Sequence, residues 1–382
     1  MNIKNYIPIK EDISFNFKPT LLSIIIALIS IGLIGLYLFG VVNFIQHGHH
    51  AYNVTREHPW GFLVGAYEFF VALAMGSVVI GASGIFYDIK VIKPLQKRLL
   101  IYGLLSLFAG FTAFLFEIGH PVTMIIYTAI SGNVTSALFW LGVFYPLFML
   151  FTLLTFISYT QNKGPIKLFA MLAIIFANSS VLTAGSIFGL LNARLFSSGI
   201  FYQIEFMVTA ILGGIFLLTL ITVLFNREDF KDAIIALKKV SISLLSLLLI
   251  MYIVRYLVGI YGNVPGKVDA INYIFHTKNF IIFELGLGIV FPLFVSVFGK
   301  RNNIGLFGIA SFFGLVGIMF SRINLVNGVE VIPLQSMMTK VYQSVPSIVN
   351  YTPSITEYAI GVGAIGVFIF FMFLAEKILK LD

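Results

Sequence analysis

Long apolar runs alternate with short polar segments along almost the whole chain. A run of about 18 apolar residues is long enough for a helix to cross the roughly 30 Å hydrocarbon core of a bilayer. The runs are continuous, which excludes the alternating pattern of an outer-membrane β-barrel. Ten spans are predicted, at 20–45, 60–86, 99–118, 136–160, 165–190, 201–225, 237–262, 277–299, 303–320 and 354–379. The pattern therefore predicts an all-α polytopic membrane protein.

Composition agrees with this interpretation. Of the 382 residues, 59% are hydrophobic and only 10% are charged, and the mean hydropathy is +0.99. These values exclude a soluble enzyme, a disordered regulator and an ordinary nucleic-acid-binding protein. The first apolar run is too long for a signal peptide and lacks a small-residue cleavage site, so we expect it to remain as a span.

The positive charges predict the orientation of the spans. The net charge is +8, and 17 of the 24 lysines and arginines fall on one side of the predicted spans. Six lie on the other side, Arg322 among them, and Arg255 lies inside a span. Because cytoplasmic loops are enriched in positive charge, both termini are predicted to be cytoplasmic.

Histidine and cysteine limit the chemistry that the chain can hold by itself. There is no cysteine, so no thiolate is available for an iron–sulfur cluster. All six histidines fall at the outer side of the predicted spans, where they cannot ligate a haem inside the membrane. The outer sequence His47-Gly48-His49-His50 is explained by a hydrated loop as well as by a metal, and no metal site is predicted.

Five charged residues are predicted to lie within the membrane, all in its outer half. Each costs roughly 2.5–3.5 kcal/mol at bilayer depth on insertion scales, so each needs a physical reason. They are Glu68, Glu117, Glu205, Arg255 and Glu284. Arg255 is expected to pair with one glutamate, with the other acids holding helices together in protonated form. Alternatively, four acids in one leaflet indicate an outward polar pocket that exchanges protons.

The second and sixth spans resemble each other. Glu68 and Glu205 stand 137 residues apart in similar surroundings, and each is followed eight residues later by a glycine. This offset carries spans 2–5 onto spans 6–9 and predicts two four-helix bundles with one flanking helix at each end. The predicted parts are an N-terminal segment with the first helix (1–48), the first bundle (49–195), the second bundle (196–322) and an outer loop with the last helix (323–382).

Several motifs resemble one known family. The segment 117–121, Glu-Ile-Gly-His-Pro, is similar to the Asp-Leu-Gly-Arg-Pro element of the NrfD-like membrane subunits of polysulfide reductase and related respiratory complexes. Asn133 and the segment 136–140, Ser-Ala-Leu-Phe-Trp, are similar to the opening of that family's next helix, and residues 61–77 resemble its preceding helix. Residues 322–326, Arg-Ile-Asn-Leu-Val, followed by Tyr351, Pro353, Ser354 and Glu357, resemble the ten-helix branch that includes hydrogenase and tetrathionate reductase subunits.

The resemblance implies a function. Such subunits anchor an extracytoplasmic module in the cytoplasmic membrane of a prokaryote and pass electrons between the menaquinone pool and that module. The implied partners are an iron–sulfur ferredoxin-like subunit and a catalytic subunit of the molybdopterin or hydrogenase type. The chain would be the quinone-reactive part of an oxidoreductase, not a complete enzyme, with no haem or cluster of its own.

The resemblance also places the quinone site in the first bundle, near the outer surface. Glu117 and His120 are expected to bind the quinone oxygens and exchange protons, while Tyr127 and Trp60 orient the ring. Because His120 replaces the family's arginine and histidine changes charge in the physiological range, quinone turnover is expected to depend steeply on pH.

Glu68 would relay protons in the same bundle. Glu205, Arg255 and Glu284 would form a second polar cluster, either structural or part of a proton route. The alternatives are a secondary transporter, which would also have repeats and intramembrane charges, and a structural anchor without a working quinone site.

Overall fold

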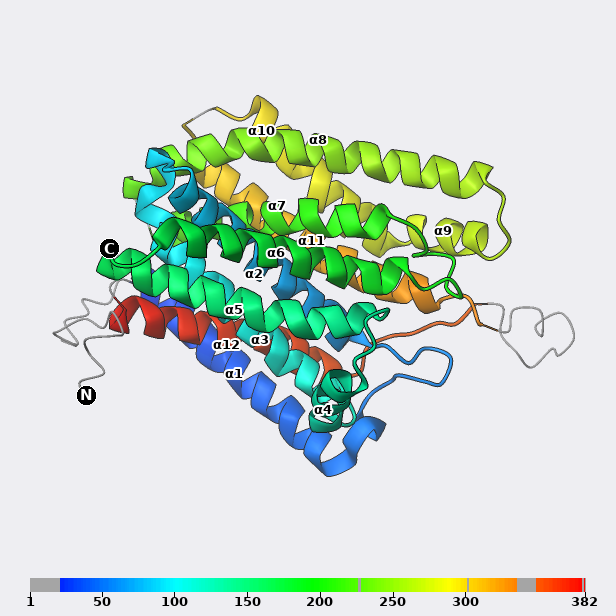
Figure 1. The fold of residues 1–382 in the computed structure, drawn as a ribbon. Coiled ribbons are helices and arrows are strands. Elements are labelled where there is room, and N and C mark those ends of the chain that lie inside the picture. Colours follow the sequence, from blue (N-terminus) through cyan, green and yellow to red (C-terminus); the bar gives the residue numbers. More distant parts are fainter. Residues whose placement is uncertain (1–20, 226–227, 301, 335–347, 380, 382) are drawn as a thin grey trace, which may run out of the picture.

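The computed structural model describes residues 21–225, 228–300, 302–334, 348–379 and 381. Every element in these residues is a helix. Within the described part of the chain, ten helices are long and apolar enough to cross a membrane, and they run along one another in an elongated bundle (Figure 1). The predicted all-α fold with ten membrane-crossing helices is confirmed, and the protein is a multi-pass membrane protein.

The long elements follow the predicted spans. They are α1 (Leu21–His47), α2 (Phe62–Phe86), α3 (Gln96–Glu117), α5 (Ala137–Gln161), α6 (Ile166–Gly189), α7 (Phe201–Leu224), α8 (Lys231–Tyr261), the π-helical η5 (Asn279–Val290) with α10 (Phe291–Phe298), α11 (Ile304–Glu330) and α12 (Ile355–Ile378). Short helices connect them: η2 (Gly48–Ala51), η3 (Lys90–Leu95), α4 (Pro121–Ser131), η4 (Glu228–Phe230) and α9 (Lys267–Phe275). The short helices α4 and α9 mark one end of the bundle, at the right of Figure 1.

Helix α2 lies at the centre of the molecule. It contacts α3, α6, α7, α11 and α12, and almost all of its side chains are buried. Its crossing with α7 depends on two glycines, because a Cβ on Gly214 would lie 2.6 Å from the carbonyl carbon of Gly76. A helix that is apolar on every side fits such a central position.

The other helices surround this centre. Helices α5 and α6 pack together beside α2, whereas α7 contacts α8 and α11, and α11 contacts η5. Helix α1 rests on α12 and leaves most of its apolar surface exposed, as expected for a lipid-facing helix. The division into two repeated bundles and the predicted boundaries at 49, 196 and 323 remain predictions.

One predicted span boundary was wrong. Helix α11 continues to Glu330, whereas the ninth span was expected to end at residue 320 with Arg322 in an outer loop. Arg322 is fully buried and pairs with Glu205, so its charge is neutralised inside the protein and does not end the helix. Seven cations counted for the orientation lie outside the described residues: Lys4, Lys10, Lys18, Arg227, Arg301, Lys340 and Lys380.

The eighth predicted span is irregular. Its first part is the π-helix η5, and Pro292 follows at the start of α10. Proline has no N–H to donate to the preceding turn, which favours a local change of helical register. Glu284 lies within this π-helical segment and is buried.

Candidate functional site

Buried polar groups converge on the first residues of α2. The N–H of Gly61, the residue that caps α2, donates to Glu117 Oε1 at 2.8 Å, and the N–H of Trp60 donates to Glu330 Oε2 at 3.1 Å. The N–H groups at a helix start have no partner within the helix and carry partial positive charge. Two carboxylates from the ends of α3 and α11 are therefore held here by backbone donors.

Gly61 permits this close approach because it has no side chain. A Cβ at this position would lie 2.9 Å from Val54 Cγ1 and 3.0 Å from the hydroxyl of Tyr351. That hydroxyl accepts a hydrogen bond from the N–H of Phe62 at 2.8 Å and donates one to Glu357. The segment before α12 is thus hydrogen-bonded to the first turn of α2.

Glu357 begins α12 and is fully buried. It forms a capping box with Ser354, whose N–H donates to Glu357 Oε2 at 2.8 Å. The same oxygen accepts the N–H of Asn53 at 3.0 Å. Burial, together with the Glu357 carboxylate, raises the pKa of Tyr351, so its hydroxyl stays protonated and acts as a donor.

His58 completes this group. Its Nδ1 lies 2.8 Å from Glu330 Oε2, and both side chains are almost entirely buried. The imidazole stacks on the ring of Tyr351 with the centroids 4.4 Å apart. We call Glu117, Glu330, Glu357, His58 and Tyr351, which surround Gly61, the Gly61 cluster. It brings together five polar side chains from four segments: the one before α2, the end of α3, the end of α11 and the start of α12.

Glu117 differs from the other acids of the cluster. Its Oε2 is shielded from solvent and has no hydrogen-bond partner among the described residues. Glu357 and Glu330 lie within electrostatic reach of it. A buried carboxylate oxygen without a donor is costly, roughly 1–3 kcal/mol, so it can accept a hydrogen bond from a ligand.

The structure separates the four residues predicted around the quinone. Trp60 lies beside Gly61, and its ring meets Phe188 edge to face at 5.6 Å. His120 immediately precedes α4 and is exposed, and Tyr127 on α4 is 65% exposed. Glu117 and Trp60 therefore share the end of α2, while His120 and Tyr127 belong to the exposed short helix.

Glu68 lies deeper, on the buried face of α2. Its side chain is 3% exposed, and its Oε2 has no hydrogen-bond partner in the described part of the chain. The neighbouring Tyr67 hydroxyl donates to the hydroxyl of Tyr145 at 2.6 Å. Glu68 is thus a second carboxylate with an unused acceptor.

The acids of the second predicted bundle are held differently. Glu205 Oε2 pairs with Arg322 Nη1 at 2.5 Å, and Glu205 Oε1 accepts the hydroxyl of Ser321 at 2.9 Å. Arg322 Nη2 donates to Thr209 Oγ1 at 2.5 Å. Both oxygens of Glu205 are therefore occupied. We call Arg322, Glu205, Thr209 and Ser321 the Arg322 cluster.

Glu284 lies across a narrow internal cavity from Glu205. One of its oxygens accepts the hydroxyl of Tyr252, and the other accepts the Asn324 amide at 2.6 Å. The cavity has room for about one water molecule. Both oxygens of Glu284 thus have donors from neighbouring helices.

Arg255 forms no ion pair among the residues that the structure describes. Its guanidinium lies over the rings of Phe196, Phe201 and Tyr202 at 4.2–4.5 Å and donates to the Phe196 carbonyl at 3.1 Å. Arg322, and not Arg255, is the cation that pairs with one of the four glutamates predicted within the membrane. Aromatic rings supply the favourable electrostatics that Arg255 needs.

Some residues of the Gly61 cluster were not predicted. Glu330 was assigned to an outer loop because the ninth span was ended too early. Glu357 lies in the pattern Ser354-x-x-Glu357, which is a readable capping-box signal, but the pattern does not show that Glu357 meets α2. His58 and Tyr351 come together only through folding.

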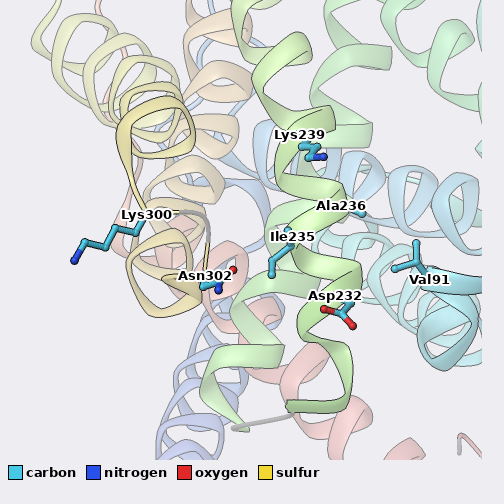
Figure 2. A pocket seen from close by; sticks show the side chains of 7 residues that line it. All are labelled: Val91, Asp232, Ile235, Ala236, Lys239, Lys300 and Asn302. Carbon is cyan, nitrogen blue, oxygen red and sulfur yellow. The ribbon is translucent and has the colours of Figure 1, made fainter.

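The opposite end of the bundle carries a separate pocket of about 780 Å³ (Figure 2). It lies between the start of α8, η3 and the connection after α10, and its lining includes Asp232, Lys239 and Lys300. Lys300 points away from the other labelled side chains in this view. In the described ranges no three histidine, aspartate or glutamate side chains gather as a metal site.

Comparison with known proteins gives two matches. The family model described as "Polysulphide reductase, NrfD" matches residues 49–333. A selenate reductase subunit from Mesobacillus selenatarsenatis is 24% identical over 386 residues, covering 89% of this chain and 88% of the relative. The family match includes Glu117, Glu330 and His58 of the Gly61 cluster and all of the Arg322 cluster.

Proposed function

The chain belongs to the NrfD polysulphide reductase family, and on this premise we propose that it is the quinone-reactive membrane subunit of a respiratory oxidoreductase. The complex would lie in the cytoplasmic membrane of a prokaryote, with the Gly61 cluster facing outward as the positive charges predict. The relative's name, which describes it as a subunit of selenate reductase, supports a place in a multi-subunit reductase.

The observation that carries the proposal is the free Oε2 of Glu117. Oxidation of a quinol to a quinone releases two electrons and two protons, so the site needs a base at the hydroxyl group. Glu117 is held in place through Oε1 by the N–H of Gly61, which leaves Oε2 to accept the quinol proton. A positioned carboxylate of this kind typically contributes 10²- to 10⁴-fold to a rate, in order of magnitude.

Neighbouring residues would complete the site. Trp60 would orient the ring, and His120 with Tyr127 would approach it from α4. The His58–Glu330 pair lies beside Glu117 at the same end of α2. This pair would accept the quinol proton from Glu117 and pass it toward the outer side of the membrane. Glu68 would relay protons within the first bundle.

The electrons must leave the chain. It has no cysteine with which to hold an iron–sulfur cluster, so their acceptor would be a partner on the outer side. We propose a ferredoxin-like iron–sulfur subunit beside a catalytic subunit of the molybdopterin or hydrogenase type, with menaquinone as the substrate in the membrane.

The test is quinol-linked turnover of the intact complex carrying Glu117→Gln. Glutamine keeps the size and the acceptor for Gly61 but is not a base, so we expect turnover to fall about 100-fold or more. Assembly, measured by copurification of the partner subunits, should be unchanged.

Glu57→Gln is the matched control, because Glu57 is an exposed acid of the segment before α2 and should keep normal turnover. Turnover of Glu117→Gln within twofold of the control would contradict the proposal.

A further inference from the structure

One of the three guanidinium nitrogens of Arg322 has no partner in the Arg322 cluster. Nη1 binds Glu205 and Nη2 binds Thr209, both on α7. The third nitrogen, Nε, is buried, and its N–H has no hydrogen-bond partner among the described residues. Arg322 itself is fully buried, and a guanidinium keeps its charge in proteins. The free donor therefore needs an acceptor other than Glu205 and Thr209.

Glu68 lies on α2, which packs against both α11 and α7. Helices α2 and α11 cross at Gly65, where a Cβ would lie 3.3 Å from the nitrogen of Ile323 and 3.4 Å from the carbonyl carbon of Arg322. Glu68 follows Gly65 by three residues and so shares its helix face. Arg322 lies within electrostatic reach of Glu68. Glu68 and Arg322, each with an unpartnered polar atom, thus both lie near the crossing of α2 and α11.

Each of these two orphaned groups would cost roughly 1–3 kcal/mol if left unsatisfied. A buried water between polar groups removes such a cost, because it can donate to a carboxylate and accept from a guanidinium. We propose that Arg322 is the shared counter-ion of Glu205 and Glu68, bound directly to the first and through water to the second. One cation would thereby join α7, α11 and α2.

The arrangement couples the two carboxylates. Glu68 and Glu205 occupy corresponding positions of the predicted internal repeat, and a single buried cation balances one negative charge. When either acid gains a proton, the other becomes the better partner for Arg322, and the effect is reciprocal. The proton occupancy of Glu68, in the first predicted bundle, then changes the interactions of Glu205 in the second.

A double-mutant cycle on the intact complex tests this inference. Glu205→Gln and Glu68→Gln should each lower the melting temperature only slightly, because the remaining carboxylate takes over Arg322. The melting temperature of the double variant should fall by far more than the two single decreases added together, since Arg322 is then buried without a carboxylate. Additive losses, or no effect of Glu68→Gln in either background, would overturn the proposal.

Two further variants make the result decisive. Glu284→Gln combined with Glu68→Gln should be additive, because both oxygens of Glu284 are bound by Tyr252 and Asn324. If the double variant cannot be purified, Arg322→Met added to it should restore assembly by removing the unpaired charge. A triple variant that stays as unstable as the double would contradict the shared counter-ion.

Discussion

The Gly61 cluster and the Arg322 cluster both bury carboxylates, but they satisfy them with different donors. In the Gly61 cluster the donors are mainly backbone N–H groups of Asn53, Trp60 and Gly61, which lie outside regular helices. In the Arg322 cluster they are the side chains of Arg322 and Ser321, projecting between long helices.

In the proposed function, this difference distinguishes a cluster that reacts with the quinol from one that holds helices together. Backbone donors at a helix start hold a carboxylate without a fixed cation beside it, and at Glu117 they leave one oxygen free. Side-chain donors surround Glu205 and Glu284 on both oxygens. In the proposed function a quinol hydroxyl would bind to Glu117 Oε2, whereas each oxygen of Glu205 and Glu284 already accepts a hydrogen bond from a side chain.

Glu284→Gln should have the largest effect on stability among the single variants that test this contrast. The amide can keep one of the two hydrogen bonds, from Tyr252 or Asn324, so we expect a loss of about 1–3 kcal/mol. Thermal melts of the purified complex measure the loss, and turnover of the complex that remains folded should stay within twofold of wild type. A turnover defect as large as that of Glu117→Gln would remove the distinction between the two clusters.

Tyr351→Phe tests the Gly61 cluster with a smaller effect. Glu357 would lose its phenolic donor but keep the N–H groups of Asn53 and Ser354, so the expected loss is ~1 kcal/mol. Assembly and turnover should persist. A variant that fails to assemble would show that the tyrosine, not the backbone, holds the cluster together.

The same variant gives a pH signature. Burial and the Glu357 carboxylate raise the pKa of Tyr351 above the ordinary value of about 10. Because the folded state keeps a proton that the unfolded chain loses, this contribution is fully present below about pH 10 and falls as the pH rises further. The difference in melting temperature between wild type and Tyr351→Phe should thus be constant near neutral pH and shrink in strong alkali. A difference that grows with pH would contradict the assignment.

The sequence predicts the helices better than it predicts the contacts between their ends. Hydropathy identifies the spans because backbone groups in lipid must form their hydrogen bonds within helices. Glu117 can be predicted as a site residue because an acidic residue near the end of an apolar span is unusual. The continuation of α11 was missed because Arg322 looks like a loop residue until Glu205, 117 residues earlier, is seen to neutralise it.

The meeting of His58 with Glu330 could not be predicted for the same reason. Neither residue lies in a motif, and the two are brought together only by the packing of α11 against α2. Ser354 and Glu357 are the opposite case, since their capping box is local and readable. Local capping is encoded by neighbours in sequence, whereas the pairing of buried polar side chains is fixed by the tertiary fold.

The central claim is that a quinone binds at the start of α2 against Glu117. Photolabelling of the intact complex with a photoreactive quinone, followed by mass spectrometry of its peptides, tests this claim most directly. The account predicts label at the start of α2 and the end of α3, abolished by excess unlabelled quinone. Label competed by quinone but confined to α7, α8 and α11 would contradict it.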